Sequence, residues 1–282
     1  MPSYDTPEPV SATAHVEAGS IQFTATDRRD TVVEVRPRDP RKDRDVRTAD
    51  QTEVTYANGE LTVRTPKSNL LGLGRTGAVD VTVELPTGSR IDLTGSWAHV
   101  IGEGKLGEVR VKTSTGDVRF DVTGPLKLTT SHGSIGVDRV EGRAEITTSS
   151  GSLRVGVVDG SAVLKNSHGT TTVGAATGEL RVSGANGDIE IRRAEDSVTA
   201  TTAHGTLRVG EVARGNVQLE TSYGSIEVGI RKGTAAWLDV GSGSGQVRNS
   251  LASSEAPEET EDTVQVRART RYGNIDVRRA KD

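Results

Sequence analysis

A glycine recurs through the last two-thirds of the chain at a nearly constant interval. Starting from Gly116, the first six intervals are 17, 18, 18, 18, 18 and 19 residues. A fixed period of this length is typical of stacked-repeat architectures, in which each repeat packs only against its neighbours. The series consists of Gly116, Gly133, Gly151, Gly169, Gly187, Gly205, Gly224, Gly245 and Gly273.

Apolar and polar residues alternate on both sides of each glycine. Around Gly133, Leu126 and Leu128 precede the glycine, and Ile135 and Val137 follow it. Alternation with a period of two predicts two half-buried strands that meet at a glycine corner. We expect each strand to pair in parallel with its equivalent in the next repeat, about 4.8 Å away. The predicted fold is therefore all-β: a single-stranded, β-helix-like parallel solenoid of about ten 18-residue coils, with an N-terminal strand cap and almost no helix.

The pattern divides the chain into two regions. Residues 1–77 contain strand-like segments at irregular spacing, and we expect them to cap the solenoid, as terminal repeats generally must. Residues 78–282 carry the solenoid repeats. An acidic stretch at 249–263 interrupts the last interval, and its charge and lack of large apolar residues predict a loop insertion.

Composition excludes several classes of function. The chain has no cysteine, so it has no disulfide and no thiolate nucleophile or metal ligand. The net charge of −4 supplies no global basic field for nucleic acid or anionic membranes. No apolar run is long enough to insert into a membrane, and the first residues do not resemble a signal peptide. We therefore expect a cytoplasmic protein, or one that a partner holds at the periphery of the cell envelope.

Several repeats share a threonine–small–x–glycine corner followed by a strand. The clearest examples are Thr130–Val137, Thr148–Val155 and Thr221–Val228. These segments resemble the bacterial β-strand-repeat family called the toastrack or "putative adhesin" domain, and the likeness covers nearly the whole chain. The resemblance implies a non-enzymatic β-solenoid associated with the bacterial envelope and its stress responses, with no catalytic residues.

The residue just before each corner glycine forms a column that contains imidazole and phenol rings. Such rings offer flat surfaces for stacking on sugars or aromatic groups. The histidines occupy alternate coils, roughly 9–10 Å apart, so they cannot share one zinc ion. We predict no metal and interpret the column either as solvent-exposed corners or as a binding strip. The candidate strip consists of His132, His168, His204, Tyr223 and Tyr272.

Other motifs favour structural roles. Asp117 and Asp188 follow their glycines and are expected to bond turn backbone, since four coils separate them by near 19 Å. Residues 72–77 match the glycine-rich sequence motif of dinucleotide-binding proteins. A strand-like segment follows them where that motif requires a helix, so we predict no cofactor. Residues 36–47 mix six basic residues with three aspartates, which favours a solvated loop or docking on an acidic partner.

We therefore predict a binding or scaffolding module without enzymatic activity, linked to envelope stress or cell-surface adhesion. Its partner is an unidentified protein or envelope component, and we expect no nucleic-acid partner. One alternative is a carbohydrate-active β-helix enzyme, which would need clustered carboxylates or basic residues on adjacent coils. A second is a self-associating structural protein, because the ends of a solenoid offer unpaired strand edges.

Overall fold

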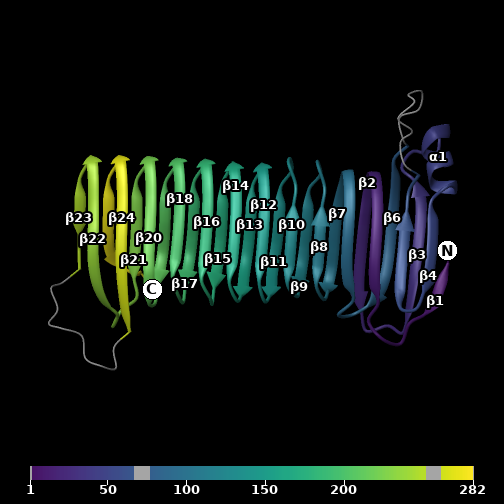
Figure 1. The fold of residues 1–282 in the computed structure, drawn as a ribbon, viewed down its shortest axis with the longest axis horizontal. Helices are drawn as coiled ribbons and strands as arrows, with labels where there is room; N and C mark the ends of the chain where they lie inside the picture. The colour runs from purple at the N-terminus through teal and green to yellow at the C-terminus, as the bar shows by residue number, and fades with distance from the viewer. Residues whose placement is uncertain (1, 67–76, 252–261, 282) are drawn as a thin grey trace. The chain divides into compact units, whose positions relative to one another are not determined.

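The computed structural model describes residues 2–66, 77–251 and 262–281. Within these ranges the chain forms 25 strands and one α-helix, α1 (Asp43–Asp50). It divides into two compact units, Met1–Glu141 and Gly142–Asp282. Figure 1 labels the strands and the helix in chain order.

The first unit contains two sheets that share strands. Its long strands β2 and β7 each turn at a corner residue, Gly19 in β2 and Ala98 in β7. The first half of each strand therefore lies in one sheet and the second half in the other. The first sheet has the order β4–β5–β2–β7–β8–β10. The second has the order β1–β3–β6–β2–β7–β9–β11. The strands are β1 (Ser3–Asp5), β2 (Ser11–Thr26), β3 (Asp30–Pro37), β4 (Glu53–Ala57), β5 (Glu60–Arg64), β6 (Val79–Pro86), β7 (Arg90–Lys105), β8 (Val109–Lys112), β9 (Val118–Thr123), β10 (Leu126–Thr129) and β11 (Ile135–Glu141).

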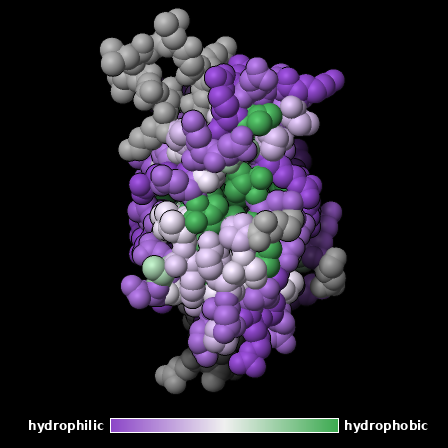
Figure 2. Space-filling model, turned by 90° about the vertical axis from the view of Figure 1, so that its right-hand side faces the viewer, coloured by the Kyte–Doolittle hydropathy of each residue, from purple (hydrophilic) through white to green (hydrophobic). Residues whose placement is uncertain are grey.

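The end of the first unit is built from antiparallel pairs. β3 runs antiparallel to β6, and β4 runs antiparallel to β5. Tyr4 and Tyr56 bring the two sheets together there, with ring centroids 5.1 Å apart. Figure 2 shows an apolar patch on this face, surrounded by polar residues. Val35 and Val54 are half-buried and line a hollow at this end.

The second unit repeats one arrangement throughout: a first strand, a corner, and a second strand in the opposite sheet. We call each such pair a rung. First strands have the order β12–β14–β16–β18–β20–β24–β22, and second strands have the order β13–β15–β17–β19–β21–β25–β23. The strands are β12 (Ala144–Ser150), β13 (Leu153–Asp159), β14 (Ala162–His168), β15 (Thr171–Ala176), β16 (Leu180–Asn186), β17 (Ile189–Ala194), β18 (Val198–His204), β19 (Leu207–Val212), β20 (Gly215–Tyr223), β21 (Ile226–Ile230), β22 (Ala235–Ser244), β23 (Val247–Asn249), β24 (Thr263–Tyr272) and β25 (Ile275–Arg279).

The last two rungs of the second unit are exchanged relative to chain order. β24 pairs with β20 on one side and with β22 on the other, so the final rung is inserted before the penultimate one. The rung formed by β22 and β23 comes second to last in the chain, but it lies at the end of the stack. The repeat period alone does not show this exchange.

The core is made of the alternating aliphatic positions. Ile135, Leu153 and Leu207 are each no more than 1% exposed. In the terminal rung the equivalent position, Val247, is 43% exposed, because no rung in the described part of the chain covers it. The all-β parallel solenoid predicted from the sequence is confirmed by these pairings and this burial.

The corner glycines are required by the backbone. Gly133 has φ of 129°, in the region that favours glycine, and a Cβ there would lie 2.2 Å from the carbonyl oxygen of Gly116. Within each unit the corners therefore lie directly against those of neighbouring rungs, which fixes the register.

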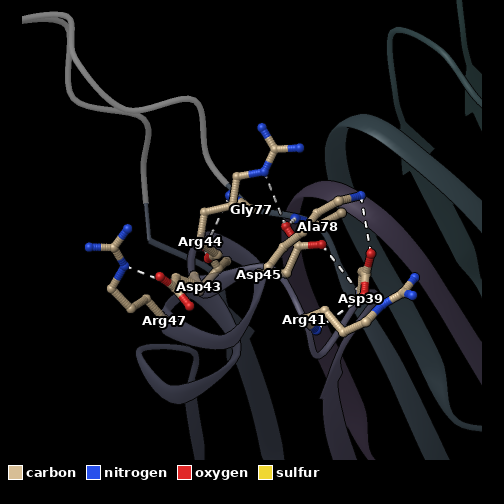
Figure 3. A network of polar contacts seen from close by, with 10 residues as sticks. Asp39, Arg41, Asp43, Arg44, Asp45, Arg47, Gly77 and Ala78 are labelled. Atoms are coloured by element: carbon tan, nitrogen blue, oxygen red, sulfur yellow. Dashed lines mark hydrogen bonds and ion pairs between the residues drawn. The ribbon is translucent and has the colours of Figure 1, made fainter.

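Part of the segment expected as a solvated loop, residues 36–47, is instead the start of helix α1. Its Asp45 is 3% exposed and accepts a hydrogen bond from the Ala78 amide at 3.0 Å, while the Thr48 hydroxyl accepts one from the Gly77 amide (Figure 3). These two bonds hold the helix against the start of β6. The loop prediction holds for residues 38–42 but was wrong for residues 43–47, because it took Asp45 to be a solvated charge.

Two further predictions concern organisation. Most of the predicted acidic insertion at 249–263 lies outside the described residues, while Asn249 ends β23 and Thr263 begins β24. The boundary between residues 77 and 78 stays a prediction. β2, which precedes that boundary, pairs in parallel with β7 as a solenoid rung does.

Candidate functional site: the corner column

The residue just before each corner glycine lies on the outside of the rung, and we call this set the corner column. Three residues before the glycine, several rungs carry a buried threonine, and in two rungs of the second unit its hydroxyl ties neighbouring corners together. The Thr221 hydroxyl donates to the Gly205 carbonyl at 3.2 Å, and the Thr270 hydroxyl donates to the Gly224 carbonyl at 2.9 Å. These bonds satisfy buried carbonyls and hold the column residues at a constant spacing.

The structure brings three of the five predicted strip residues together. In the second unit His204 pairs with Tyr223, and Tyr223 pairs with Tyr272. His168 belongs to the same column but is separated from His204 by Asn186. His132 lies in the first unit, where it forms a bridge with Thr115.

His204, Tyr223 and Tyr272 form a continuous stack, which we call the aromatic ladder. The ring centroids of His204 and Tyr223 are 5.0 Å apart with planes 3° apart, and those of Tyr223 and Tyr272 are 4.9 Å apart with planes 10° apart. The tyrosines are 47% and 49% exposed. A ring inserted between two others needs a separation of about 7 Å, twice a van der Waals contact of roughly 3.5 Å. The ladder therefore presents its ring edges and its outermost faces to a ligand.

One face of the Tyr272 ring stacks on Tyr223, and the opposite face is not covered by another ring of the corner column. The next member of the column is Ser244, which pairs with Tyr272. Ser244 lies in the glycine–serine corner of the terminal rung, residues 241–245. Since no side chain in that corner is larger than serine, the position that would continue the ladder holds no ring.

Trp97 is a member of the corner column that the sequence analysis missed. It forms a bridge with Thr115, pairs with Ala18 and is 69% exposed. The signal was present in the sequence, because Ala98 lies 18 residues before Gly116 and takes the place of the corner glycine. The residue before it is then the column position.

The carboxylates after the corners have structural roles. Asp117 accepts a hydrogen bond from the Ser134 amide at 2.8 Å, and Asp188 accepts one from the Thr206 amide at 2.7 Å. Each acceptor therefore binds the equivalent residue of the next rung. The aspartates do bond corner backbone, but that of the next rung and not of their own turn as predicted.

Ion pairs engage Glu195, Glu211 and Glu227 on the second-strand side of the second unit. Arg231 lies 2.8 Å from Glu195 and 2.7 Å from Glu211. The guanidinium lowers the pKa of Glu195, chiefly through their hydrogen bonds, and the two carboxylates raise the pKa of Arg231. Arg208 lowers the pKa of Glu227 in the same way. These carboxylates serve in structural ion pairs.

Among the described residues, no group of three or more His, Asp or Glu side chains is arranged to hold a metal ion. No described helix has the length and apolar character needed to cross a membrane.

The fold and the corner column define a two-sheet β-solenoid with an aromatic edge. The family model described as Toastrack DUF4097 matches residues 14–281, so the chain belongs to the toastrack family. This membership agrees with the resemblance found in the corner motifs.

The solved structures that match the chain share little sequence with it. A crystal structure titled a putative adhesin from Parabacteroides merdae ATCC 43184 has a TM-score of 0.45 and 14% identity, and the match covers 80% of this chain and 94% of that one. One from Parabacteroides distasonis ATCC 8503, also titled a putative adhesin, has a TM-score of 0.46 and 13% identity, with 98% and 95% covered. The comparison with curated proteins found no match.

Proposed function

We propose that the chain is a non-enzymatic binding module that recognises an extended glycan through the aromatic ladder. The observation that carries this proposal is the stack of His204, Tyr223 and Tyr272, with both tyrosines about half exposed. Exposed rings held in a rigid stack lose little conformational freedom on binding, which is the advantage of a pre-organised site.

The ladder's geometry favours a sugar polymer as the ligand. One imidazole edge and two phenol edges follow one another at the spacing of the rungs, so they offer repeated hydrogen-bond donors and acceptors. The uncovered face of Tyr272 provides an apolar surface above Ser244, where the C–H face of one sugar ring can stack. A long ligand lying along the column uses both features.

Binding of neutral oligosaccharides to purified protein on a glycan array, followed by calorimetry on the best ligand, tests this proposal. We expect Tyr272→Ala to weaken binding by about tenfold or more, as loss of one exposed aromatic contact does. Trp237→Ala is the matched control, because Trp237 is 67% exposed but lies outside the corner column. Equal affinity in the wild type and Tyr272→Ala would reject the ladder as the site.

The family resemblance supports a setting at the bacterial cell envelope, in adhesion or in the response to envelope stress. Cell fractionation combined with antibody labelling of intact cells separates a surface location from a cytoplasmic one. Labelling of intact cells is the result expected for adhesion.

A second candidate function is self-association through the terminal rung. In this rung Leu238 and Val240 are half-buried, Val247 is 43% exposed, and the outer edges of β22 and β23 have no paired strand among the described residues. A second copy pairing there would cover these aliphatic side chains. Light scattering across a concentration series tests this function, with Val247→Lys expected to shift a dimer to a monomer. A monomeric mass for the wild type throughout would remove it.

A further inference from the structure

The first unit has a basic hollow beside helix α1. It has a volume of about 770 Å³ and lies between the Arg38–Arg44 segment and Trp97. Volumes of this order are typical of sites for small molecules or short polymer segments. Its lining carries four basic side chains, Arg38, Arg41, Lys42 and Arg44, against two acidic ones, Asp39 and Asp45.

The acidic side chains engage three of the four basic ones. Asp39 binds Arg41 at 3.1 Å and Lys42 at 3.4 Å, and Asp45 lies 3.5 Å from Arg44. Figure 3 shows Arg41 folded against Asp39, and Arg44 beside Asp45. Hydrogen bonds from Arg41 lower the pKa of Asp39, so this carboxylate stays ionised and keeps its partners oriented.

Arg38 differs from these three. It is exposed, and no ion pair joins its side chain to any residue in the described ranges. Its backbone amide donates a hydrogen bond to the Ala78 carbonyl at 3.0 Å, which fixes the Arg38 backbone beside the start of β6. The hollow therefore contains a net positive charge and one guanidinium free to bind an anion.

A second hollow continues from the first along the corner column. The two share Ala18, Arg38, Ala78 and Trp97, and the second extends past Thr115 to Gly133. We call the combined surface the corner trough. It crosses four strand spacings of about 4.8 Å, roughly 19 Å in all. A surface of this length fits a chain of linked units better than a single small molecule.

The corner trough is lined by the Trp97 ring on one side and by glycine backbone at its base. Trp97 lines both hollows, and its neighbours in the column are the small residues Ala18 and Thr115, which is why it is 69% exposed. Gly19 and Gly116 contribute backbone without side chains to the floor. A sugar ring can therefore approach the indole face closely, while an attached anionic group reaches Arg38.

We propose that the corner trough binds an anionic saccharide chain, with a sugar ring stacked on Trp97 and a carboxylate, sulfate or phosphate group on Arg38. This site is separate from the aromatic ladder, which lies in the second unit, and its ligand carries a charge that the ladder does not require.

Fluorescence of Trp97 provides a direct test. The chain has two tryptophans, so Trp237→Phe leaves Trp97 as the single indole reporter. In this background we titrate three probes: alginate hexasaccharide for carboxylates, heparin hexasaccharide for sulfates, and neutral dextran oligosaccharide. We expect a saturable change in emission with at least one anionic probe and none with dextran. Affinity should also fall as salt is added, because the charges on this surface are screened.

Variants of the basic residues assign the contact. Arg38→Gln should weaken binding of the anionic probe by about tenfold, the effect of losing one charge-assisted hydrogen bond. Arg47→Gln is the matched control, since Arg47 is an exposed arginine of the adjacent helix α1 and lies outside the lining of both hollows. Circular dichroism confirms that both variants fold. Trp97→Ala, measured by calorimetry, should weaken binding to a similar extent.

Four results would overturn the proposal: no emission change with either anionic probe, equal binding of dextran, equal loss in Arg38→Gln and Arg47→Gln, or tighter binding of ATP than of the saccharides. The last would assign the trough to nucleotides. Tyr272→Ala should leave binding of the anionic probe unchanged, so failure at the ladder and failure at the trough are distinguishable.

Discussion

Tyr223 and Tyr272 stack with their ring centroids 4.9 Å apart, although the whole of the β22–β23 rung lies between them in the chain. The contact exists because β24 is inserted between β20 and β22. Had the rungs stacked in chain order, Ser244 would have been the neighbour of Tyr223. The exchanged rungs thus add Tyr272 to the stack that His204 and Tyr223 form in chain order.

The exchange predicts which of two equivalent aliphatic positions contributes more to the free energy of unfolding. Ile275 and Val247 occupy the same position in their rungs, but Ile275 is 0% exposed and Val247 is 43% exposed. We expect Ile275→Ala to lower the free energy of unfolding by about 2–5 kcal/mol, as large-to-small core changes do. Val247→Ala should cost less than about 0.5–1 kcal/mol, as surface changes do. Urea denaturation measures both, and a larger loss in Val247→Ala would mean that the rungs follow chain order.

The sequence was sufficient to predict the architecture because its cause is local. Each rung needs aliphatic residues at fixed offsets from a corner glycine, and Leu153 or Leu207 shows this offset directly. The exchange of the last rungs depends on which of two similar rungs covers β20, and both carry the same pattern. Side-chain periodicity cannot distinguish them.

The site was partly predictable for the same reason. The column position identified His204, Tyr223 and Tyr272, but the contact between the two tyrosines depends on the exchanged order. The sequence therefore could not show that these three residues form a continuous stack within the longer candidate strip. Trp97 was missed because an alanine, Ala98, stands at its corner. Helix α1 was missed because its stability comes from Asp45 and Thr48 bonding to Ala78 and Gly77, residues far along the chain.

The corner geometry predicts a sharp contrast between two glycines of the same rung. Gly133 has positive φ and meets the Gly116 backbone, whereas a Cβ at Gly136 would have nothing within 4 Å. We expect Gly133→Ala to destabilise the protein by about 2–3 kcal/mol or more, because both strain and displaced backbone oppose the methyl group. Gly136→Ala should change the free energy of unfolding by less than about 1 kcal/mol in either direction. Similar losses in both variants, measured by urea denaturation, would contradict the corner geometry.

The Arg231 cluster predicts a stability contribution that depends on pH. Because Arg231 lowers the pKa of Glu195, the ionised carboxylate favours the folded state. This contribution is fully present above the unfolded-state pKa, about 4.3, and is lost as the pH falls through the folded-state pKa. At neutral pH we expect Glu195→Gln to cost about 1 kcal/mol, since the pair is a third exposed and screened.

The check on this prediction is chemical denaturation of wild type and Glu195→Gln between pH 7 and pH 3. The difference between them should shrink toward zero at the acid end. Glu179→Gln is the control, because Glu179 pairs with Arg181 at 2.7 Å with both side chains about half exposed or more. A difference for Glu195→Gln that stays constant with pH would exclude the ion pair as its source.

The aromatic ladder predicts an energetic coupling between its two tyrosines. Stacked rings contribute about 0.5–1.5 kcal/mol beyond the area that they bury. In a double-mutant cycle, Tyr223→Ala and Tyr272→Ala together should cost less than the sum of the single changes by this amount, because the first substitution already removes the contact. A cycle of Tyr223→Ala with Trp237→Ala is the control, since Trp237 has no ring contact within the described ranges. Coupling near zero in both cycles would mean that the rings lie side by side in the ladder without stabilising one another, and pre-organisation of the binding surface would then have to come from the corner threonines alone.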